Sequence, residues 1–309
     1  MTLAACNNGS QPQGLTNTQP ADIQQNVNIS NPTTAVFDLV EVTPGGTFNL
    51  VWSDEFDGDQ LDPETWFFAT GDGSEFIGDG GVMGLPPGWG NFEKQYYLPR
   101  NAQLENGFLR ITARSESIEG FNYTSARITT RDRVNVRYGR IAAKIKFPAG
   151  QGLWSAFWLL SQGSPYGRWA ATGEIDIVEA VNLGALPGPG GGGFNNIVGN
   201  LYYGGESPNI AFSGDTYAPS PNITEGFHTY AVEWDENEIR WYFDDVLWLT
   251  QNSWSSTGGD FPAPFDQPFY IILNTAVGGS FPGDDVDNTA LPASMLVDWV
   301  RVYSGVRPD

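Results

Sequence analysis

Three carboxylates lie within six residues in the segment Gly173–Glu179, Gly-Glu-Ile-Asp-Ile-Val-Glu, where they alternate with aliphatic side chains. β-Branched residues favour a strand, in which successive side chains point to opposite faces. Glu174 and Asp176 then share one face, but strict alternation would place Glu179 on the apolar face, where an unpaired charge is costly. One extra residue near Val178, a β-bulge, would return Glu179 to the face of the other two acids. The segment therefore predicts a bulged strand with three acids on one face.

Such crowding has a chemical consequence. Neighbouring carboxylates repel one another, so at least one pKa rises and the groups separate into an acid and a base. Glycoside hydrolysis needs that pair, one carboxylic acid and one carboxylate on either side of a sugar bond. The alternative is an edge strand whose acidic side chains are only solvated, and the rest of the chain must decide between the two.

The composition of the chain indicates an all-β fold. Charged residues make up only 17%, while 38 Gly and 21 Pro separate many short apolar segments. This pattern is typical of a β-sandwich. The net charge of −21 disfavours nucleic acids and anionic membranes as partners. With Cys6 and His228 as the single cysteine and histidine, an intrachain disulfide and a multi-histidine metal centre are excluded.

Several strands can be placed from alternation and turn residues. Glu105-Asn106-Gly107 predicts the turn of a hairpin within 103–114, and Asp244-Asp245 predicts a turn between two later strands. The other predicted strands are 48–52, 125–130, 138–147, 153–160, 197–203, 228–234, 238–243, 270–276 and 295–303.

The N-terminal segment differs from the rest of the chain. Leu3-Ala4-Ala5-Cys6 resembles a bacterial lipobox, and residues 7–35 contain no aromatic residue, Lys or Arg. Such a segment cannot bury enough apolar surface to fold. We interpret residues 1–35 as a truncated lipoprotein-like signal remnant followed by a disordered linker, an accidental lipobox match being the alternative. An extracellular or cell-surface protein is expected, which would contact a membrane only through lipidation of Cys6.

Tryptophans gather around the acidic strand. Trp154 and Trp158 share one face of the strand 153–160, and a short loop containing Trp169 leads from it to Glu174. If the two strands form a hairpin, these indoles lie beside the carboxylates, as in a carbohydrate cleft. Trp89 stands among glycines and a proline in the long loop 71–90, so we expect it outside the core, as a sugar-stacking surface or a lid.

These segments together resemble glycoside hydrolase family 16, specifically its laminarinase-like branch of endo-1,3-β-glucanases. Gly173–Glu179 matches the family pattern Glu-x-Asp-x-x-Glu. Gly88–Tyr97, Gly-Trp-Gly-Asn-Phe-Glu-Lys-Gln-Tyr-Tyr, is similar to the branch pattern Gly-Trp-Gly-Asn-Asn-Glu-Leu-Gln-Tyr-Tyr. Further matches in family order are 52–56, 154–160, 227–234 and 297–303.

The resemblance implies a catalytic domain over residues 36–309: a β-jelly roll sandwich of two antiparallel sheets with a concave substrate cleft. It implies a retaining mechanism, with Glu174 as nucleophile, Glu179 as acid/base and Asp176 tuning the pair. The substrate would be laminarin-type β-1,3-glucan or mixed-linkage β-glucan, and no protein partner is implied. The residues expected to line the sugar subsites are Trp89, Asn91, Arg127, Trp154, Trp158, Trp169 and Tyr202.

The family also implies one structural cation. Carried over by position, its ligands would fall near Glu55, Gly107 and Asp298, and calcium suits oxygen ligands of this kind. The chemistry itself requires no cofactor.

Two departures from the family pattern leave alternatives open. Tyr202 occupies a position where many relatives have histidine, and tyrosine does not titrate near neutrality. The loop before the acidic strand also lacks the proline common after its Trp. Agarase- or carrageenase-type galactan hydrolases of the same family can share the longer acidic motif and remain an alternative, as does a non-catalytic β-glucan-binding protein.

Overall fold

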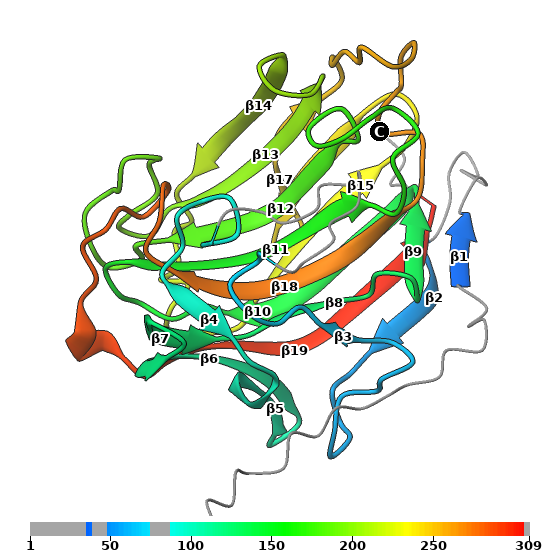
Figure 1. Ribbon diagram of the computed structural model, residues 1–309. Coiled ribbons are helices and arrows are strands. Elements are labelled where there is room, and N and C mark those ends of the chain that lie inside the picture. The colour runs from blue at the N-terminus through cyan, green and yellow to red at the C-terminus, as the bar shows by residue number, and fades with distance from the viewer. Residues whose placement is uncertain (1–34, 39–47, 75–86, 306–309) are drawn as a thin grey trace, which may run out of the picture. The chain divides into compact units, whose positions relative to one another are not determined.

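Regular structure in the computed structural model is almost entirely β-strand (Figure 1). The structure describes residues 35–38, 48–74 and 87–305. Within these ranges the strands form two sheets, which confirms the predicted all-β class. Cys6 and nearly all of the segment 1–35 lie outside the described residues, so their lipidation and disorder stay predictions.

The first sheet carries the acidic strand. Its order is β1-β9-β18-β11-β12-β13-β14, and β8 pairs with both β18 and β3. All pairings given for it are antiparallel except β1 with β9. Figure 1 shows β14 at the upper edge of this sheet. Its strands are β1 (Ala35–Asp38), β3 (Phe67–Phe68), β8 (Arg127–Thr129), β9 (Val134–Arg137), β11 (Leu153–Ser161), β12 (Glu174–Val181), β13 (Ile197–Gly204), β14 (Ile210–Tyr217) and β18 (Phe269–Val277).

The second sheet has the order β17-β16-β15-β10-β19-β6-β7-β4, with β2 beside β19 and β5 beside β6. One of its pairs, β4 with β7, is parallel. Its strands are β2 (Asn49–Asp54), β4 (Gln95–Tyr97), β5 (Ala102–Glu105), β6 (Phe108–Ile118), β7 (Phe121–Ser125), β10 (Gly139–Lys146), β15 (His228–Trp234), β16 (Ile239–Phe243), β17 (Val246–Gln251) and β19 (Ala293–Ser304). Two short 3₁₀ helices, η1 (Pro99–Asn101) and η2 (Asn288–Ala290), lie in connections.

The main core forms where the apolar faces of the two sheets meet. Phe157 and Leu273 from the first sheet pack in one cluster with Val232 and Trp241 from the second. Alternation explains this: β15 buries Tyr230, Val232 and Trp234 in that cluster, while its intervening residues face the other way. Sheet-on-sheet packing of this kind leaves the opposite face of each sheet available for other chemistry.

Turn residues fix several connections as predicted. Asn106 and Gly107 both have positive φ, 56° and 78°, and join β5 to β6. Two consecutive residues with positive φ form the tight turn whose twist matches a β-hairpin, and Asn-Gly is the preferred pair there. Asp244 and Asp245 make the equivalent turn between β16 and β17.

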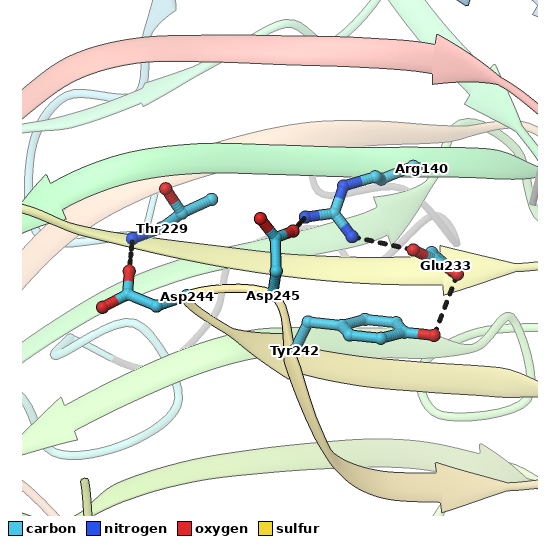
Figure 2. A network of polar contacts seen from close by, with 6 residues as sticks. All are labelled: Arg140, Thr229, Glu233, Tyr242, Asp244 and Asp245. Atoms are coloured by element: carbon cyan, nitrogen blue, oxygen red, sulfur yellow. Dashed lines mark hydrogen bonds and ion pairs between the residues drawn. The ribbon is translucent and has the colours of Figure 1, made fainter. Parts of the chain in front are cut away.

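The outer face of the second sheet holds a network of ion pairs and hydrogen bonds in which Arg140 and Glu233 are buried and Asp245 is exposed (Figure 2). Arg140 on β10 donates to Glu233 on β15 and to Asp245 in the turn, each at 2.8 Å. Tyr242 donates to the second oxygen of Glu233 at 2.9 Å. Because Glu233 is only 1% exposed, its charge needs these partners. The network joins three strands on the side away from the first sheet.

Within the described ranges, no helix has the length and apolar character needed to cross a membrane.

Candidate active site

Strand β12 contains the predicted bulge. On the β11 side, Phe157 lies opposite Val178, but the next residue, Trp158, lies opposite Asp176, so Ile177 has no partner. The pairing of β12 with β13 shifts at the same place. Ile177 and Val178 therefore both enter the core cluster. The bulge therefore places Glu179 on the same face of the strand as Glu174 and Asp176.

The three acids accordingly share the face of the first sheet that points away from the core, which we call the carboxylate face. Residues directly opposite each other in antiparallel strands project to the same side. Trp158 lies opposite Asp176, and Tyr202 lies opposite Glu174. Asp176 and Glu179 are 3% and 6% exposed, while Glu174 is half-buried. Successive cross-strand partners form a row across this face, in the order Arg127, Asn274, Ala156 and Glu179.

Glu174 is held by an indole. Trp169 Nε1 donates to Glu174 Oε2 at 2.9 Å from the loop between β11 and β12. That loop is fixed by Arg168, whose guanidinium makes two bonds to Glu206 Oε2, at 2.9 and 2.7 Å. Burial raises the pKa of Glu174, the hydrogen bond from Trp169 lowers it, and the charge of Glu179 raises it again. The net effect is a raised pKa, so the indole only partly offsets burial in favouring the ionised form that a nucleophile needs.

Glu179 is held by a second indole and an amide. Trp154 Nε1 donates to Glu179 Oε1, and Asn200 Nδ2 donates to Glu179 Oε2, each at 2.9 Å. Burial raises the pKa of Glu179, and these two donors partly oppose the rise. The carboxyl group can therefore keep a proton well above the ordinary range of glutamate while remaining fixed in position.

Asp176 lies between them and is the least solvated of the three. Its Oδ2 is buried and accepts no hydrogen bond from the described residues. Burial raises the pKa of Asp176 well above its usual value, and the charges of Glu174 and Glu179 raise it further. Three acids so close cannot all ionise at neutral pH, because each buried charge disfavours the next.

Replacing Asp176 with asparagine is expected to stabilise the protein increasingly as pH rises. A carboxyl group whose pKa is raised by folding binds its proton more tightly when native, so stability falls as pH rises between the unfolded and native pKa values. Asparagine does not titrate and removes this loss. Each pKa unit corresponds to about 1.4 kcal/mol, so the gain in Tm should grow by roughly 2–6 °C between about pH 4 and pH 8.

Thermal unfolding of both proteins across this pH range measures the difference. Asp57→Asn, at an exposed position, controls for the loss of one negative charge. A Tm difference for Asp176→Asn that stayed constant with pH would contradict the raised pKa.

Arg127 on β8 lies between two tryptophans. Its guanidinium carbon is 4.7 Å from the ring centroids of both Trp89 and Trp158. Arg127 is only 7% exposed, and its charge lowers the pKa of both Glu174 and Glu93. Arg127 lies on the carboxylate face, and its predicted role in lining the sugar subsites stays a prediction.

The expectation that Trp89 lies outside the core is wrong. Trp89 is 3% exposed and packs with Ala69 and Tyr97, and its Nε1 donates to the carbonyl of Gly71 at 3.2 Å. The flanking glycines cause this, because the tight turn of positive φ through Gly88 folds the indole inward. Trp89 therefore supports Arg127 from beneath and does not present an open stacking surface.

Sequence reasoning missed a buried polar chain behind Trp158. Trp158 Nε1 donates to Asn274 Oδ1 at 2.7 Å, Asn274 donates to the Tyr97 hydroxyl at 3.1 Å, and Tyr97 donates to Glu93 at 3.1 Å. Glu93 also accepts from Gln95 at 2.6 Å and from Asn91 at 3.3 Å. The motif that contains Asn91 was visible in the sequence, but its role as a support for Trp158 was not. Asn91 is half-buried with its amide turned to Glu93.

A second missed support lies beside Trp154. The Phe281 ring packs edge-on against Trp154, with centroids 5.4 Å apart. The glycine-rich loop after β12 wraps Phe281, and Gly190 donates its N–H to the Phe281 carbonyl. A Cβ at Gly190 would collide with the Phe281 ring, so the loop needs glycine there. This loop thus fixes the indole that binds Glu179.

Gly214 on β14 makes room for Asn200. The two residues are directly opposite each other, and a Cβ at Gly214 would overlap the Asn200 amide and the Gly199 carbonyl. We expect Gly214→Ala to displace Asn200 from Glu179. Loss of this donor should raise the pKa of Glu179 further, shift the alkaline limb of the pH–rate profile upward and lower kcat/KM roughly tenfold.

Kinetics against pH test this expectation, with Asn200→Ala expected to give the same shift. Gly226→Ala is the matched control, because a Cβ there meets only the His228 ring at 3.6 Å. An unchanged alkaline limb in both Gly214→Ala and Asn200→Ala would contradict the role of Asn200.

Tyr202 lies next to Glu174 across the strand pair. Its ring contacts Trp169, with centroids 5.6 Å apart. Burial raises the pKa of its hydroxyl, and the charges of Asp176 and Glu179 raise it further, so it stays protonated. Tyr202 can donate a hydrogen bond to a ligand but cannot act as a base near neutrality.

The two acidic residues predicted to bind calcium form ion pairs with basic side chains. Glu55 accepts two bonds from Arg301, at 2.9 and 2.7 Å, and Asp298 pairs with Lys144 at 2.7 Å. Gly107 lies in the β5–β6 turn and offers only backbone atoms. No cluster of three or more acidic, histidine or cysteine side chains suited to a metal occurs in the described part of the chain. As arranged, these side chains do not fit a calcium ion, and the predicted ion stays a prediction.

Comparison with known proteins bears on this arrangement. The model of the family described as glycosyl hydrolases family 16 matches residues 93–301, which include β12 and all three acids. The chain belongs to glycosyl hydrolase family 16. The glucan endo-1,3-beta-glucosidase A1 of Niallia circulans is 36% identical over 91% of this chain, and the beta-glucanase of Rhodothermus marinus is 38% identical over 84%.

This family 16 chain spans 40% of the length of the Niallia protein and 86% of the Rhodothermus one. The solved laminarinase from Rhodothermus marinus has a TM-score of 0.71 and 37% identity, covering 84% of this chain and 99% of that one. The laminarinase catalytic domain from Thermotoga maritima gives a TM-score of 0.70 at 35% identity, covering 85% and 100%. The two-sheet architecture is therefore that of the family's jelly roll, as the sequence resemblance implied.

Proposed function

We propose that this family 16 protein is a retaining endo-1,3-β-glucanase that hydrolyses laminarin-type β-glucan or mixed-linkage β-glucan. One observation carries the proposal. Glu174 and Glu179 lie on the same face of one strand, and each is bound by a different indole, Trp169 for Glu174 and Trp154 for Glu179. Two fixed carboxyl groups beside aromatic rings supply both the chemistry and the sugar contacts that glycoside cleavage needs.

In the first step, a Glu174 carboxylate oxygen attacks the anomeric carbon, and the bond from that carbon to the leaving sugar oxygen breaks. Glu179 gives its proton to the leaving oxygen. The product is a glycosyl ester on Glu174. Burial raises the pKa of both glutamates, which favours a protonated Glu179, and the hydrogen bond from Trp169 opposes this rise at Glu174, which begins the step ionised.

In the second step, water attacks the anomeric carbon and transfers a proton to Glu179, while the ester bond to Glu174 breaks. Two inversions leave the anomeric configuration unchanged. Asp176 tunes this cycle, because its own pKa is raised well above the ordinary value and its protonation depends on the charges of both glutamates. The cycle returns Glu179 to its protonated form.

The sugar-binding surface that we propose consists of rings on the carboxylate face. Trp154 and Trp158 are half-buried, and Trp169 is 38% exposed, so each offers part of its ring to a ligand. Tyr202 adds a hydroxyl donor beside Glu174. Arg127 and Asn91 act chiefly through Trp158, because their polar groups face protein neighbours.

We also propose that the protein acts outside the cell, since polymeric glucans of this kind are too large to cross a membrane. Attachment through a lipidated Cys6 would add a cell-surface location, and mass spectrometry of full-length protein extracted from membranes would show an acylated N-terminal cysteine.

A reducing-sugar screen on laminarin, lichenan, agarose and carrageenan tests the proposed function. We expect the highest rate on laminarin, and NMR of the first product should show the β-anomer. Activity confined to agarose or carrageenan would replace the glucanase proposal with a galactan hydrolase. Binding to laminarin without hydrolysis of any of the four would replace it with a glucan-binding protein.

A further inference from the structure

Phe212 is a large apolar side chain that the described core does not use. It lies on β14, the edge strand of the first sheet, and is 70% exposed. Its cross-strand partner is Tyr202, and the partner of Tyr202 on the next strand is Glu174. Glu174, Tyr202 and Phe212 therefore form one row across three neighbouring strands. The Phe212 ring projects from the carboxylate face and not into the core.

Neighbouring aromatic rings contact one another along this row. Trp169, which binds Glu174, lies 5.6 Å from Tyr202 with an angle of 40° between the ring planes. Tyr202 lies 5.9 Å from Phe212 with an angle of 33°. Three aromatic rings thus extend from the carboxyl group of Glu174 to the edge of the sheet. Phe212, at the outer end, is 70% exposed, against 38% for Trp169, while Tyr202 between them is half-buried.

The surroundings of Phe212 favour a neutral sugar chain as its ligand. The ring is continuous with the proposed sugar-binding surface, and aromatic faces contact the apolar faces of pyranoses without needing charge. An uncharged polymer also meets no repulsion from a chain whose net charge is −21. The nearest residues of β14 that share the face of Phe212 are Ile210, which is half-buried, and Gly214, which has no side chain, so Phe212 is the large exposed ring at this edge.

We propose that Phe212, together with Tyr202, forms a further glucosyl-binding subsite at the β14 edge of the carboxylate face. It binds a sugar unit distant from the cleaved bond and so makes the enzyme prefer long β-glucan chains. This inference rests on the proposed glucanase function and adds a chain-length preference to it.

The test measures kcat and KM of Phe212→Ala on β-1,3-oligosaccharides of increasing length, beginning with the shortest one that the wild type cleaves. We expect KM for the longest oligosaccharides and for laminarin to rise roughly 5- to 20-fold, with kcat nearly unchanged. The shortest substrate, which does not reach the edge, should be cleaved as by the wild type. Phe212→Trp keeps a ring and should keep the preference for long chains.

Phe261→Ala is the matched control, since Phe261 is 49% exposed and its ring stacks on Trp254, which is not part of this row. It should leave the length dependence unchanged. Equal losses on every length in Phe212→Ala, or no loss on any, would overturn the subsite. If the wild type cleaves no β-1,3-glucan of any length, the proposed function itself fails and the subsite with it.

Discussion

Glu174→Ala is expected to lower kcat on laminarin by roughly four orders of magnitude or more, because it removes the group that forms the covalent intermediate. The fold should persist. Glu174 is half-buried on the carboxylate face, outside the core cluster, and its removal relieves repulsion with Glu179. Kinetics on laminarin and thermal unfolding of the purified variant measure the two effects.

Azide distinguishes a lost nucleophile from a damaged site. In Glu174→Ala, azide can occupy the space of the carboxylate and attack the anomeric carbon of an activated β-glycoside from the opposite side, giving an α-glycosyl azide. Rescue of turnover with this product is the expected result. Turnover near the wild-type rate without azide would show that Glu174 is not the nucleophile.

Glu179→Ala is expected to lower kcat on laminarin by roughly 10²- to 10⁴-fold, the usual contribution of a general acid. The effect should depend on the substrate. Aryl glycosides with good leaving groups do not need protonation, so their first step should be nearly as fast as in the wild type. Azide should then intercept the glycosyl ester on Glu174 and give a β-glycosyl azide, the opposite anomer to that from Glu174→Ala.

The pH profile supplies an independent check on Glu179. Because burial raises its pKa, the wild-type activity should extend above the ordinary carboxyl range and fall only as Glu179 loses its proton. Glu179→Ala should lack this alkaline limb. Retention of the limb, together with equal losses on natural and activated substrates, would assign the proton donor to another residue.

Both predictions depend on an arrangement that costs stability. Asp176 and Glu179 are almost completely buried, and their charged forms are disfavoured by burial and by each other. The protein compensates with a few fixed donors, Trp169, Trp154 and Asn200, and leaves Asp176 Oδ2 without one among the described residues. Buried acids with raised pKa values are expected where carboxyl groups must hold and release protons.

Much of this site could be predicted from local sequence. The parity of Glu174, Asp176 and Glu179 required a bulge, and the structure contains one, with Ile177 unpaired. Alternation placed Trp154 and Trp158 on the acidic side of β11. Such predictions succeed because side chains alternate along a strand with a period of two and a buried charge is costly. A few residues therefore determine which face of the strand enters the core and which carries the acids.

Other features could not be predicted in this way. Trp89 was expected outside the core, yet it lies beneath Arg127. The strand β14 was not predicted at all, since Gly214 and polar residues interrupt its pattern. Gly214 is needed because the Asn200 amide and the Gly199 carbonyl, on the neighbouring strand, occupy the space of a side chain. These outcomes depend on contacts between segments far apart in the chain.

The sequence by itself determined the all-β class, the bulged strand and the identity of the acids that lie together, because each follows from local alternation and the cost of burying charge. Only the tertiary structure decided which donors bind each carboxyl group: Trp169 for Glu174, and Trp154 with Asn200 for Glu179. It also decided that Phe212 extends the row of rings to the sheet edge. The physical reason is that a pKa and a binding surface depend on neighbours from other strands, and strand order and register are fixed only when the two sheets pack.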